Sequence, residues 1–216
     1  MITAQISTIP GREQMLKNTV QSLIGQVDRL RVVLNNHKHT PAGLNGCDII
    51  YLRNHKGDAG KIYKLPRHGY IFLCDDDLIY PPDYIKVMIN RLNSENNKII
   101  LTCHGRIMCQ KPVRNSYTDR IAAFHCLKTE TYDGALSIGG TGVMAFSTEY
   151  FWPNYKNVHS KNMLDIWIAK FAHNQLITIK LQPHNEGWII YQNPAHTIWD
   201  DAFADPAEQT NLYNSF

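Results

Sequence analysis

The sequence predicts an α/β fold in which helices flank a mixed, mostly parallel central sheet. Two observations support this prediction. Residues 2–35 alternate a strand-like segment, a helical pattern and a second strand-like segment, which is the order of a βαβ unit. Residues 70–74 form an unbroken apolar run, which is typical of a parallel strand covered on both faces. The 216 residues, of which 44% are hydrophobic, suit one compact domain over residues 1–216.

The elements of the first half follow in a consistent order. Residues 2–9 alternate polar and apolar side chains and end at Pro10, before a helical pattern over residues 15–24. Further strands are predicted at residues 30–35 and 47–52, with a loop between them. A right-handed crossover and parallel strands are strongly favoured for such a beginning, and a nucleotide is the ligand class that it most often serves.

Three successive carboxylates, Asp75, Asp76 and Asp77, directly follow the apolar run. In open α/β sheets the ligand lies just beyond the carboxyl ends of such strands. Carboxylates this close repel one another unless a hard cation, Mn2+ or Mg2+, supplies the opposite charge through oxygen ligands. The alternative is a solvated turn whose acids favour the N-terminus of a helix predicted to begin near Pro81.

Residues 53–67 are polar, basic and glycine-containing. One interpretation is a loop and short helix that bring Lys61 or Lys64 to a diphosphate, with Asp58 accepting a hydrogen bond from a base or ribose. The alternative is an ordinary solvated connection.

A second helix and strand, at residues 84–92 and 99–103, lead to His104 and Arg106. Because these side chains also follow a strand end, they are candidates to lie beside the same crevice. A structural role for the histidine and a surface position for the arginine are the alternatives. Residues 107–135 have mixed periodicity and are interpreted as an excursion that covers the site.

The glycine-rich turn at residues 139–142 precedes an apolar strand and allows the backbone to approach a flat ligand such as a sugar ring. Farther on, the helical pattern at residues 163–172 carries Asp165 as its single acid, near its beginning. A buried acid needs a reason. Asp165 is therefore a candidate general base, or else a first-turn carboxylate that the helix dipole favours.

The C-terminal part begins with a predicted strand at residues 177–181. Beyond it, Trp188 and Trp199 are candidates either to stack on sugar faces or to pack internally. Residues 204–216 are predicted to form a polar, loosely held end.

Composition excludes some function classes. The net charge of +3, with acids and bases interleaved, does not resemble the basic footprint of a nucleic-acid binder. The five cysteines include no C-x-x-C pair, which predicts reduced, buried thiols in a cytoplasmic protein. No apolar stretch approaches the length of a membrane span, so we expect at most peripheral contact with the inner face of a membrane.

The order of these motifs, with the acidic triplet and the following Pro-Pro-Asp-Tyr sequence as the most specific part, resembles that of inverting, family 2-like glycosyltransferases. The resemblance spans residues 2–182 and implies the A-type glycosyltransferase fold, which is Rossmann-like. It implies metal-dependent transfer of a sugar from a nucleoside diphosphate sugar, with a UDP-sugar favoured, to a hydroxyl acceptor. A glycan, or a polysaccharide or glycolipid precursor that is lipid-linked, would be the acceptor. Residues 1–103 would be the nucleotide-sugar-binding half, and residues 104–216 the acceptor-binding and catalytic half.

The resemblance also implies roles for individual residues. Asp165 would be the catalytic base, and Asp75 and Asp77 would bind the metal, joined by a C-terminal histidine. His196 and His184 are the candidates for that histidine, with structural roles as the alternative. The nucleotide sugar would be held by Ile9, Pro10, Arg12, Asp58, Lys61, Asp75, Asp76 and Gly140.

Two departures from the family pattern leave details open. Cys74 stands where many relatives have another acid, so the assignment of the triplet members to metal and ribose is not fixed. Leu164 stands where many have a glutamate, which leaves Asp165 as the acid available to act as base. The alternatives to this function are a sugar nucleotidyltransferase, which usually has a longer glycine-rich first loop, and a non-catalytic carbohydrate-binding protein. Transfer with retention is the mechanistic alternative.

Overall fold

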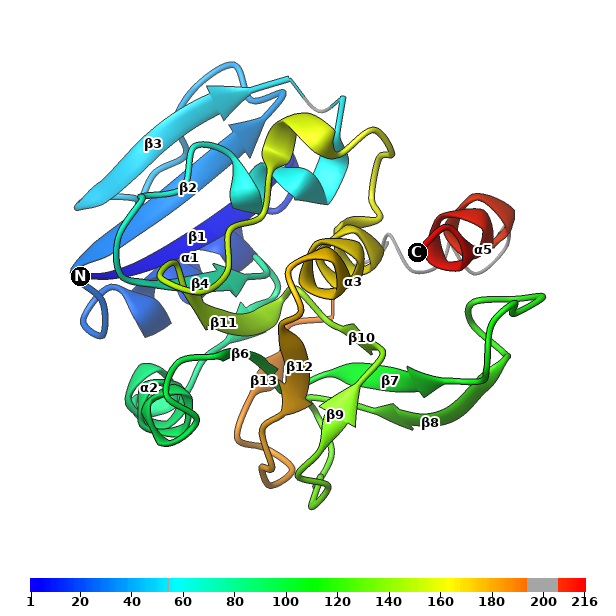
Figure 1. Cartoon of the computed structure of the whole chain (residues 1–216). Helices are drawn as coiled ribbons and strands as arrows, with labels where there is room; N and C mark the ends of the chain where they lie inside the picture. The colour runs from blue at the N-terminus through cyan, green and yellow to red at the C-terminus, as the bar shows by residue number, and fades with distance from the viewer. Residues whose placement is uncertain (54, 194–205) are drawn as a thin grey trace.

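The structure is a computed structural model that describes residues 1–53, 55–193 and 206–216. A twisted sheet with the strand order β3-β2-β1-β4-β11-β6-β12-β9 runs through the molecule, and helices cover both of its faces (Figure 1). This arrangement confirms the predicted α/β class with a mixed, mostly parallel sheet.

The first half forms the parallel part of the sheet. Strand β1 pairs with β2 on one side and β4 on the other, and β2 pairs with β3, in each case in parallel. The elements of this half are β1 (Ile2–Thr8), α1 (Glu13–Leu23), β2 (Arg29–Asn35), β3 (Cys47–Leu52), the short 3-10 helix η1 (Gly57–Ile62), β4 (Tyr70–Cys74), α2 (Tyr84–Ser94) and β6 (Ile99–Thr102).

An antiparallel strand completes the centre of the sheet. Strand β11 (Val143–Ser147) lies between β4 and β6 and runs antiparallel to both. Helix α3 (Leu164–Asn174) then returns the chain to β12 (Thr178–Leu181), which pairs in parallel with β6 and antiparallel with the short β9 (Ala135–Leu136). The start of β11 therefore meets the carboxyl ends of β4 and β6 at one edge.

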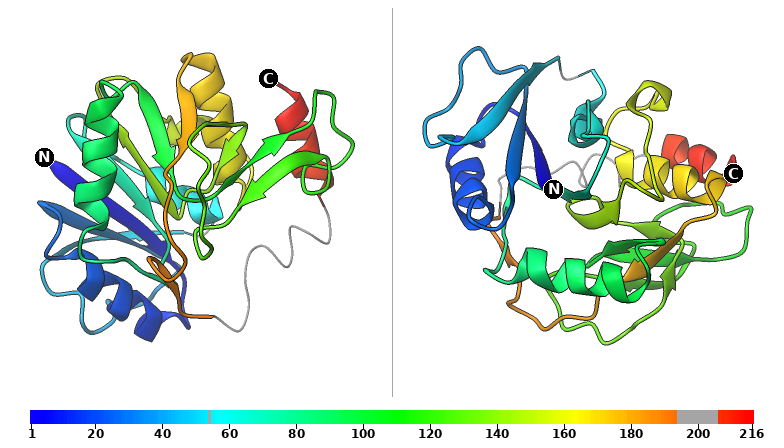
Figure 2. Two further views of the ribbon diagram at one scale, coloured as in Figure 1. Left: turned by 90° about the horizontal axis from the view of Figure 1, so that it is seen from below. Right: turned by 60° about the vertical axis from the view of Figure 1, so that its left-hand side comes forward.

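Two smaller sheets and short helices extend the domain. Strand β7 (Gly105–Met108) pairs antiparallel with β8 (Arg120–Phe124) and with β10 (Ile138–Gly139), and forms the projecting arm that Figure 2 shows from two further directions. Strand β13 (Ile190–Tyr191) pairs with β5 (Leu78–Ile79). The described residues also form the helices η2 (Tyr155–Asn157) and α5 (Ala207–Asn214).

Each face of the sheet carries its own apolar core. Helices α1 and α2 pack on one face, where the side chains of Phe72, Tyr84 and Met88 are fully buried. Helices α3 and η1 cover the other face, where Leu73, Phe146 and residues of α3 are buried. Successive residues of β4 point to opposite faces, which explains why its sequence is apolar without alternation.

The structure confirms the helix expected at residues 84–92, which is α2, and corrects three other sequence-based expectations. The predicted loose end is in fact helix α5, in which Gln209, Thr210 and Tyr213 are buried against the domain. The segment expected to be one glycine turn and strand is divided into β9, β10 and β11. The expectation that the thiols are buried is also wrong for Cys109, which is exposed.

Among the described residues, no helix combines the length and the apolar character that crossing a bilayer requires.

Candidate active site

The predicted site residues gather where β1, β4 and β6 end and β11 begins. The acidic triplet follows β4, while Arg12 lies just before α1 and Lys61 lies in η1. Strand β1 is parallel to β4, so the loop after β1 reaches the same edge as the triplet. The chain thus brings two cations from separate connections to the three carboxylates.

Asp76 is the most deeply buried member of the triplet, with its side chain 5% exposed. The Thr8 hydroxyl donates to its Oδ2 at 2.5 Å, and the Arg12 guanidinium donates to its Oδ1 at 2.8 Å. Burial raises the pKa of Asp76, while Arg12 and Thr8 oppose that shift. These contacts use both carboxylate oxygens, so Asp76 fixes the loop after β1 against the end of β4.

Asp75 contacts the second cation of the site, Lys61. Its carboxylate forms an ion pair with the Lys61 ammonium, whose own side chain is 6% exposed. The same ammonium donates to the Thr141 hydroxyl at 3.3 Å. Burial by itself lowers the pKa of Lys61, but the charges of Asp75 and Asp58 outweigh it, so the net shift is upward. Lys61 therefore stays charged and connects the triplet to the glycine-rich turn.

Asp77 is the least satisfied of the three acids. Its contact with a cation is a longer one, 3.4 Å from Oδ2 to the Arg12 guanidinium. Burial raises the pKa of Asp77 to about 7, and repulsion from Asp75 and Asp76 adds to the shift. A group of carboxylates with this much uncompensated charge has the chemistry of a cation site.

Two members of the triplet could coordinate a divalent ion. Asp76 is already committed to Thr8 and Arg12, so Asp75 and Asp77 are the members with capacity to coordinate. Within the described residues, no group of three or more Asp, Glu, His or Cys side chains is arranged so that all of them could hold one metal ion. Two carboxylates still fit Mg2+ or Mn2+, because Mg2+ is commonly bound by one or two carboxylates together with substrate phosphates and water. His196, the predicted third ligand, lies outside the described residues.

Asp165 lies in the first turn of α3 and faces the glycine-rich turn. Its Oδ1 accepts hydrogen bonds from the backbone N–H of Thr141 at 2.8 Å and from its hydroxyl at 2.6 Å. The residue is half-buried. Because Thr141 also accepts from Lys61, a continuous series of contacts runs from Asp75 through Lys61 and Thr141 to Asp165.

Asp58 lies at the start of η1, and its carboxyl caps another helix. Its Oδ2 accepts from the backbone N–H of Leu164 at 3.1 Å, at the beginning of α3, while its Oδ1 is buried without a hydrogen-bond partner. Burial raises the pKa of Asp58 to about 7, against the lowering effect of Lys61. This acid thus ties η1 to α3.

The backbone of the triplet is held by a buried tyrosine. The Tyr80 hydroxyl donates to the carbonyl of Gly142 at 2.5 Å and accepts from the N–H of Asp75 at 2.9 Å. Gly142 leaves room for the Asp75 carboxylate, because a Cβ on it would lie 1.9 Å from Asp75 Oδ2 and would displace that side chain. The tyrosine therefore fixes the separation between β4 and β11 at the point where Asp75 leaves the sheet.

The other predicted residues are placed as follows. Ile9 and Pro10 are exposed at the end of β1. Gly140 forms two hydrogen bonds at the end of β6. Its N–H donates to the His104 carbonyl at 2.8 Å, and its carbonyl accepts from the Thr102 hydroxyl at 2.9 Å.

The candidate histidines and tryptophans lie in different surroundings. His104 packs edge-on against His125, and burial lowers its pKa to about 4, which favours the neutral ring. His184 is buried, with Nδ1 2.8 Å from the Gln182 carbonyl. Trp188 packs on Tyr84 and donates to Asp83. Trp199 lies outside the described residues.

Sequence reasoning did not assign a role to Thr8, Tyr80 or Thr141. Thr8 and Thr141 each carry a hydroxyl to a carboxylate of the site. The available signal was position: Thr8 ends β1, and Thr141 interrupts a run of glycines. Tyr80 gave no comparable signal, because its partner Gly142 is 62 residues away.

The fold is similar to that of several solved structures. Glucosyl-3-phosphoglycerate synthase from Mycobacterium tuberculosis, in complex with Mn2+, UDP-glucose and phosphoglyceric acid, has a TM-score of 0.58 at 14% identity, covering 99% of this chain and 79% of that chain. The same synthase with Mg2+ and UDP has a TM-score of 0.57 at 14% identity over the same shares. A 4-diphosphocytidyl-2C-methyl-D-erythritol synthase from Anaerococcus prevotii has a TM-score of 0.50 at 13% identity, covering 97% and 98%. These likenesses confirm the fold. Neither a protein-family model nor a curated protein sequence matches the chain.

Tyr80→Phe should destabilise the domain by about 1–3 kcal/mol, because it removes two buried hydrogen bonds while keeping the ring. Tyr70→Phe is the matched control, since its hydroxyl bonds to Asn93 in an exposed position where water can replace it. Urea denaturation of both variants measures the difference. Equal losses in the two variants would show that Tyr80 does not hold the strand ends together.

Asp58→Asn should change the pH dependence of stability. The folded pKa of about 7 lies above the ordinary value of 3.8, so the acid stabilises the fold fully below the lower value and loses this contribution as the pH rises through 7. The amide keeps an acceptor for Leu164 and does not titrate. The free energy of unfolding of the variant, minus that of the parent, should therefore increase between about pH 4 and pH 7 and level off above that range.

Asp119→Asn is the control for this measurement. The backbone N–H of Arg114 lowers the pKa of Asp119, so its contribution is lost only as the pH falls below the ordinary value. The corresponding difference should stay flat over the same range. A flat difference for Asp58→Asn as well would contradict the raised pKa.

Proposed function

We propose that this chain is a metal-dependent glycosyltransferase that moves a sugar from a nucleoside diphosphate sugar to a hydroxyl acceptor with inversion. The observation that carries the proposal is the contact series from Asp75 through Lys61 and Thr141 to Asp165. It connects the carboxylates that would bind the metal to a half-buried acid, Asp165, at the same edge of the sheet. A transfer reaction needs these two functions side by side.

The donor would lie over residues 1–103. Lys61 and Arg12 are the cations at the edge where a diphosphate would approach, and Ile9, Pro10 and Asp58 would adjoin the nucleoside. The fold that binds UDP-glucose with Mn2+ in the mycobacterial synthase supports a UDP-sugar as donor. Asp76 and Gly140 would line the part of the site on which the nucleotide sugar lies.

Asp75 and Asp77 would hold the Mn2+ or Mg2+ ion. When bound, the ion would supply positive charge that stabilises the diphosphate as it leaves. Lys61 would add a second positive charge beside Asp75. The fold's likeness to a structure that holds Mg2+ and UDP supports the choice of ion.

Asp165 would accept the proton of the acceptor hydroxyl. The two bonds from Thr141 both go to Oδ1 and fix the orientation of the carboxylate. Among the described residues, Oδ2 has no hydrogen-bond partner, so it can face a hydroxyl. The hydroxyl oxygen would attack the anomeric carbon opposite the leaving diphosphate, which inverts the configuration. Residues 104–216 would hold the acceptor.

A sugar nucleotidyltransferase is the second candidate, because the 4-diphosphocytidyl-2C-methyl-D-erythritol synthase shares the fold over 98% of its own chain. The short turn from Ile9 to Arg12 favours the first candidate, since it lacks a long glycine-rich loop. The products distinguish them: a glycosyltransferase or its slow donor hydrolysis releases nucleoside diphosphate, whereas a nucleotidyltransferase releases pyrophosphate. Release of neither, across a panel of nucleotide sugars with Mn2+, would favour a non-catalytic carbohydrate-binding protein.

Asp77→Asn should weaken binding of UDP in the presence of Mn2+ by at least about tenfold, because it removes one of two carboxylates that would hold the ion. Chelation of Mn2+ should have a comparable effect on the parent. Titration calorimetry measures both. Asp133→Asn is the control, because Asp133 is an exposed acid paired with Arg91 away from the triplet. Parent-like affinity of the Asp77 variant would refute the metal assignment.

Asp165→Asn should reduce sugar transfer by about 10²–10⁴-fold, because the amide retains the size of the side chain and loses its basicity. UDP and Mn2+ binding should stay at the level of the parent. Rates of UDP release with and without acceptor provide the measurement, and the anomeric configuration of the product tests inversion. Full transfer by the variant, or a product of retained configuration, would overturn this assignment.

A further inference from the structure

Arg106 is a cation that the proposed donor half does not use. It lies on β7 and is half-buried, and its Nε is fully buried without a hydrogen-bond partner. In the described part of the chain, no carboxylate forms an ion pair with it. One face of the guanidinium lies against the ring of Tyr117, at 4.8 Å from Cζ to the ring centroid. A ring can face only the plane of a guanidinium, so the in-plane N–H groups still need acceptors.

Arg106 lies near Asp165. It pairs in register with Ile138 of β10, and β10 packs against α3. Thr141, shortly after β10, donates to Asp165. The two side chains also influence each other electrostatically: burial lowers the pKa of Arg106, and the charge of Asp165 is the largest effect that opposes this. The cation is therefore close to the position where the acceptor hydroxyl would be deprotonated.

The surroundings of Arg106 are built from the second half of the chain. The N–H of Ser116, next to Tyr117, donates to the Thr210 hydroxyl of α5 at 2.9 Å. Helix α5 packs in turn on α3, as Figure 1 shows. Tyr117 and the arm from which Arg106 projects are thus fixed against the domain.

A half-buried guanidinium with unused N–H groups is suited to bind an anion, since its planar fork matches phosphate and carboxylate oxygens. A cation left in this state costs stability unless a ligand completes it. We propose that Arg106 binds a phosphate or carboxylate group of the acceptor, so that the acceptor is a small anionic hydroxyl compound rather than a neutral glycan. The identification of the anion as part of the acceptor rests on the proposed glycosyltransferase function, whereas the anion site does not.

The anion site is tested without any donor. Inorganic phosphate, added at constant ionic strength to the full chain, should raise the melting temperature of the parent, because a ligand that binds the folded state stabilises it. Acetate in a parallel titration distinguishes a carboxylate site from a phosphate site. Arg106→Gln should bind the preferred anion at least about tenfold more weakly, because the charged fork is lost. Arg106→Lys should be intermediate, because it keeps the charge and loses the fork.

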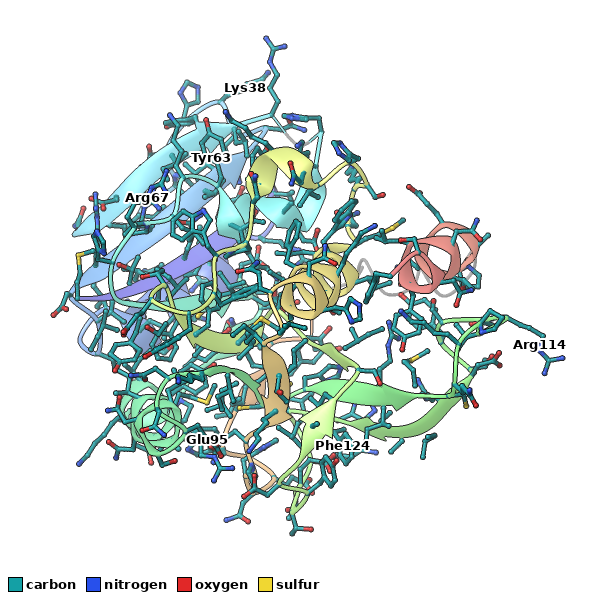
Figure 3. All side chains as sticks on the ribbon, in the orientation of Figure 1. Lys38, Tyr63, Arg67, Glu95, Arg114 and Phe124 are labelled. Atoms are coloured by element: carbon teal, nitrogen blue, oxygen red, sulfur yellow. The ribbon has the colours of Figure 1, made fainter. Side chains whose placement is uncertain are left out.

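Arg114→Gln is the matched control. Arg114 lies in the segment that connects β7 to β8, but its side chain is 96% exposed and extends away from the body of the molecule (Figure 3). This variant should respond to phosphate and acetate as the parent does. An Arg106→Gln variant that folds and responds like the parent to both ions, or a parent that responds to neither, would overturn the anion site.

The acceptor role is tested with glycerol and glycerol 3-phosphate, which differ only in the anionic group. With UDP-glucose and Mn2+ present, the parent should use the phosphorylated acceptor with at least about tenfold higher kcat/KM, and Arg106→Gln should lose this preference mainly through KM. Equal use of both acceptors by the parent would overturn the inference. Absence of nucleoside diphosphate release with any donor would refute the proposed function instead, and the phosphate titration would still decide the anion site.

Discussion

Electrostatic repulsion among three adjacent carboxylates at the end of β4 is the constraint on which the site depends. The protein meets it with two cations, because Arg12 contacts Asp76 and, at a longer distance, Asp77, while Lys61 contacts Asp75. Asp76 contacts Thr8 and Arg12 from the connection after β1, and Asp75 contacts Lys61 from η1. Two separate connections must therefore be correctly placed before the end of β4 is stable. The parallel pairing of β1 with β4 is what places the first of them.

The antiparallel strand β11 links this acidic edge to the second half of the chain. Its register with β4 puts Val143 beside Cys74, so the residues just before β11 lie against the triplet. Gly142 provides the space for Asp75, and Thr141 contacts both Lys61 and Asp165. A parallel strand in this position would begin at the far edge of the sheet. The antiparallel direction is therefore what brings the glycine-rich turn and α3 to the acids.

The sequence was sufficient for the fold class and for the location of the triplet, because long apolar runs and the order of elements depend on local composition. It was insufficient where an interaction joins distant segments. Tyr80 and Gly142 are an example, since neither residue identifies the other in the sequence. Helix α5 is another: its polar composition predicted a loose end, but tertiary contacts by Tyr213 and Thr210 hold it in place.

Asp58 shows a different limit of sequence reasoning. A polar acid in a glycine-containing loop was predicted to accept a hydrogen bond from a ligand, and in the structure one of its carboxylate oxygens accepts from the backbone at the start of α3. A helix N-terminus offers unpaired backbone N–H groups, which a carboxylate satisfies as well as it satisfies a base or ribose. Sequence cannot distinguish these acceptor roles, because both need the same residue type. The unpartnered Oδ1 leaves one acceptor that the helix does not use.

The small number of carboxylates has a thermodynamic consequence for the proposed reaction. With Asp76 bound to Arg12, an ion held by Asp75 and Asp77 would have only two protein ligands, which are too few for tight binding by themselves. Oxygens of a donor diphosphate would complete its coordination, and the ion would in turn offset the repulsion between those oxygens and the triplet. Each would then bind more tightly in the presence of the other, and by the same factor, because coupling between two ligands is reciprocal. In the proposed reaction, this acidic edge would therefore bind the metal and the diphosphate together, although it would repel the diphosphate alone.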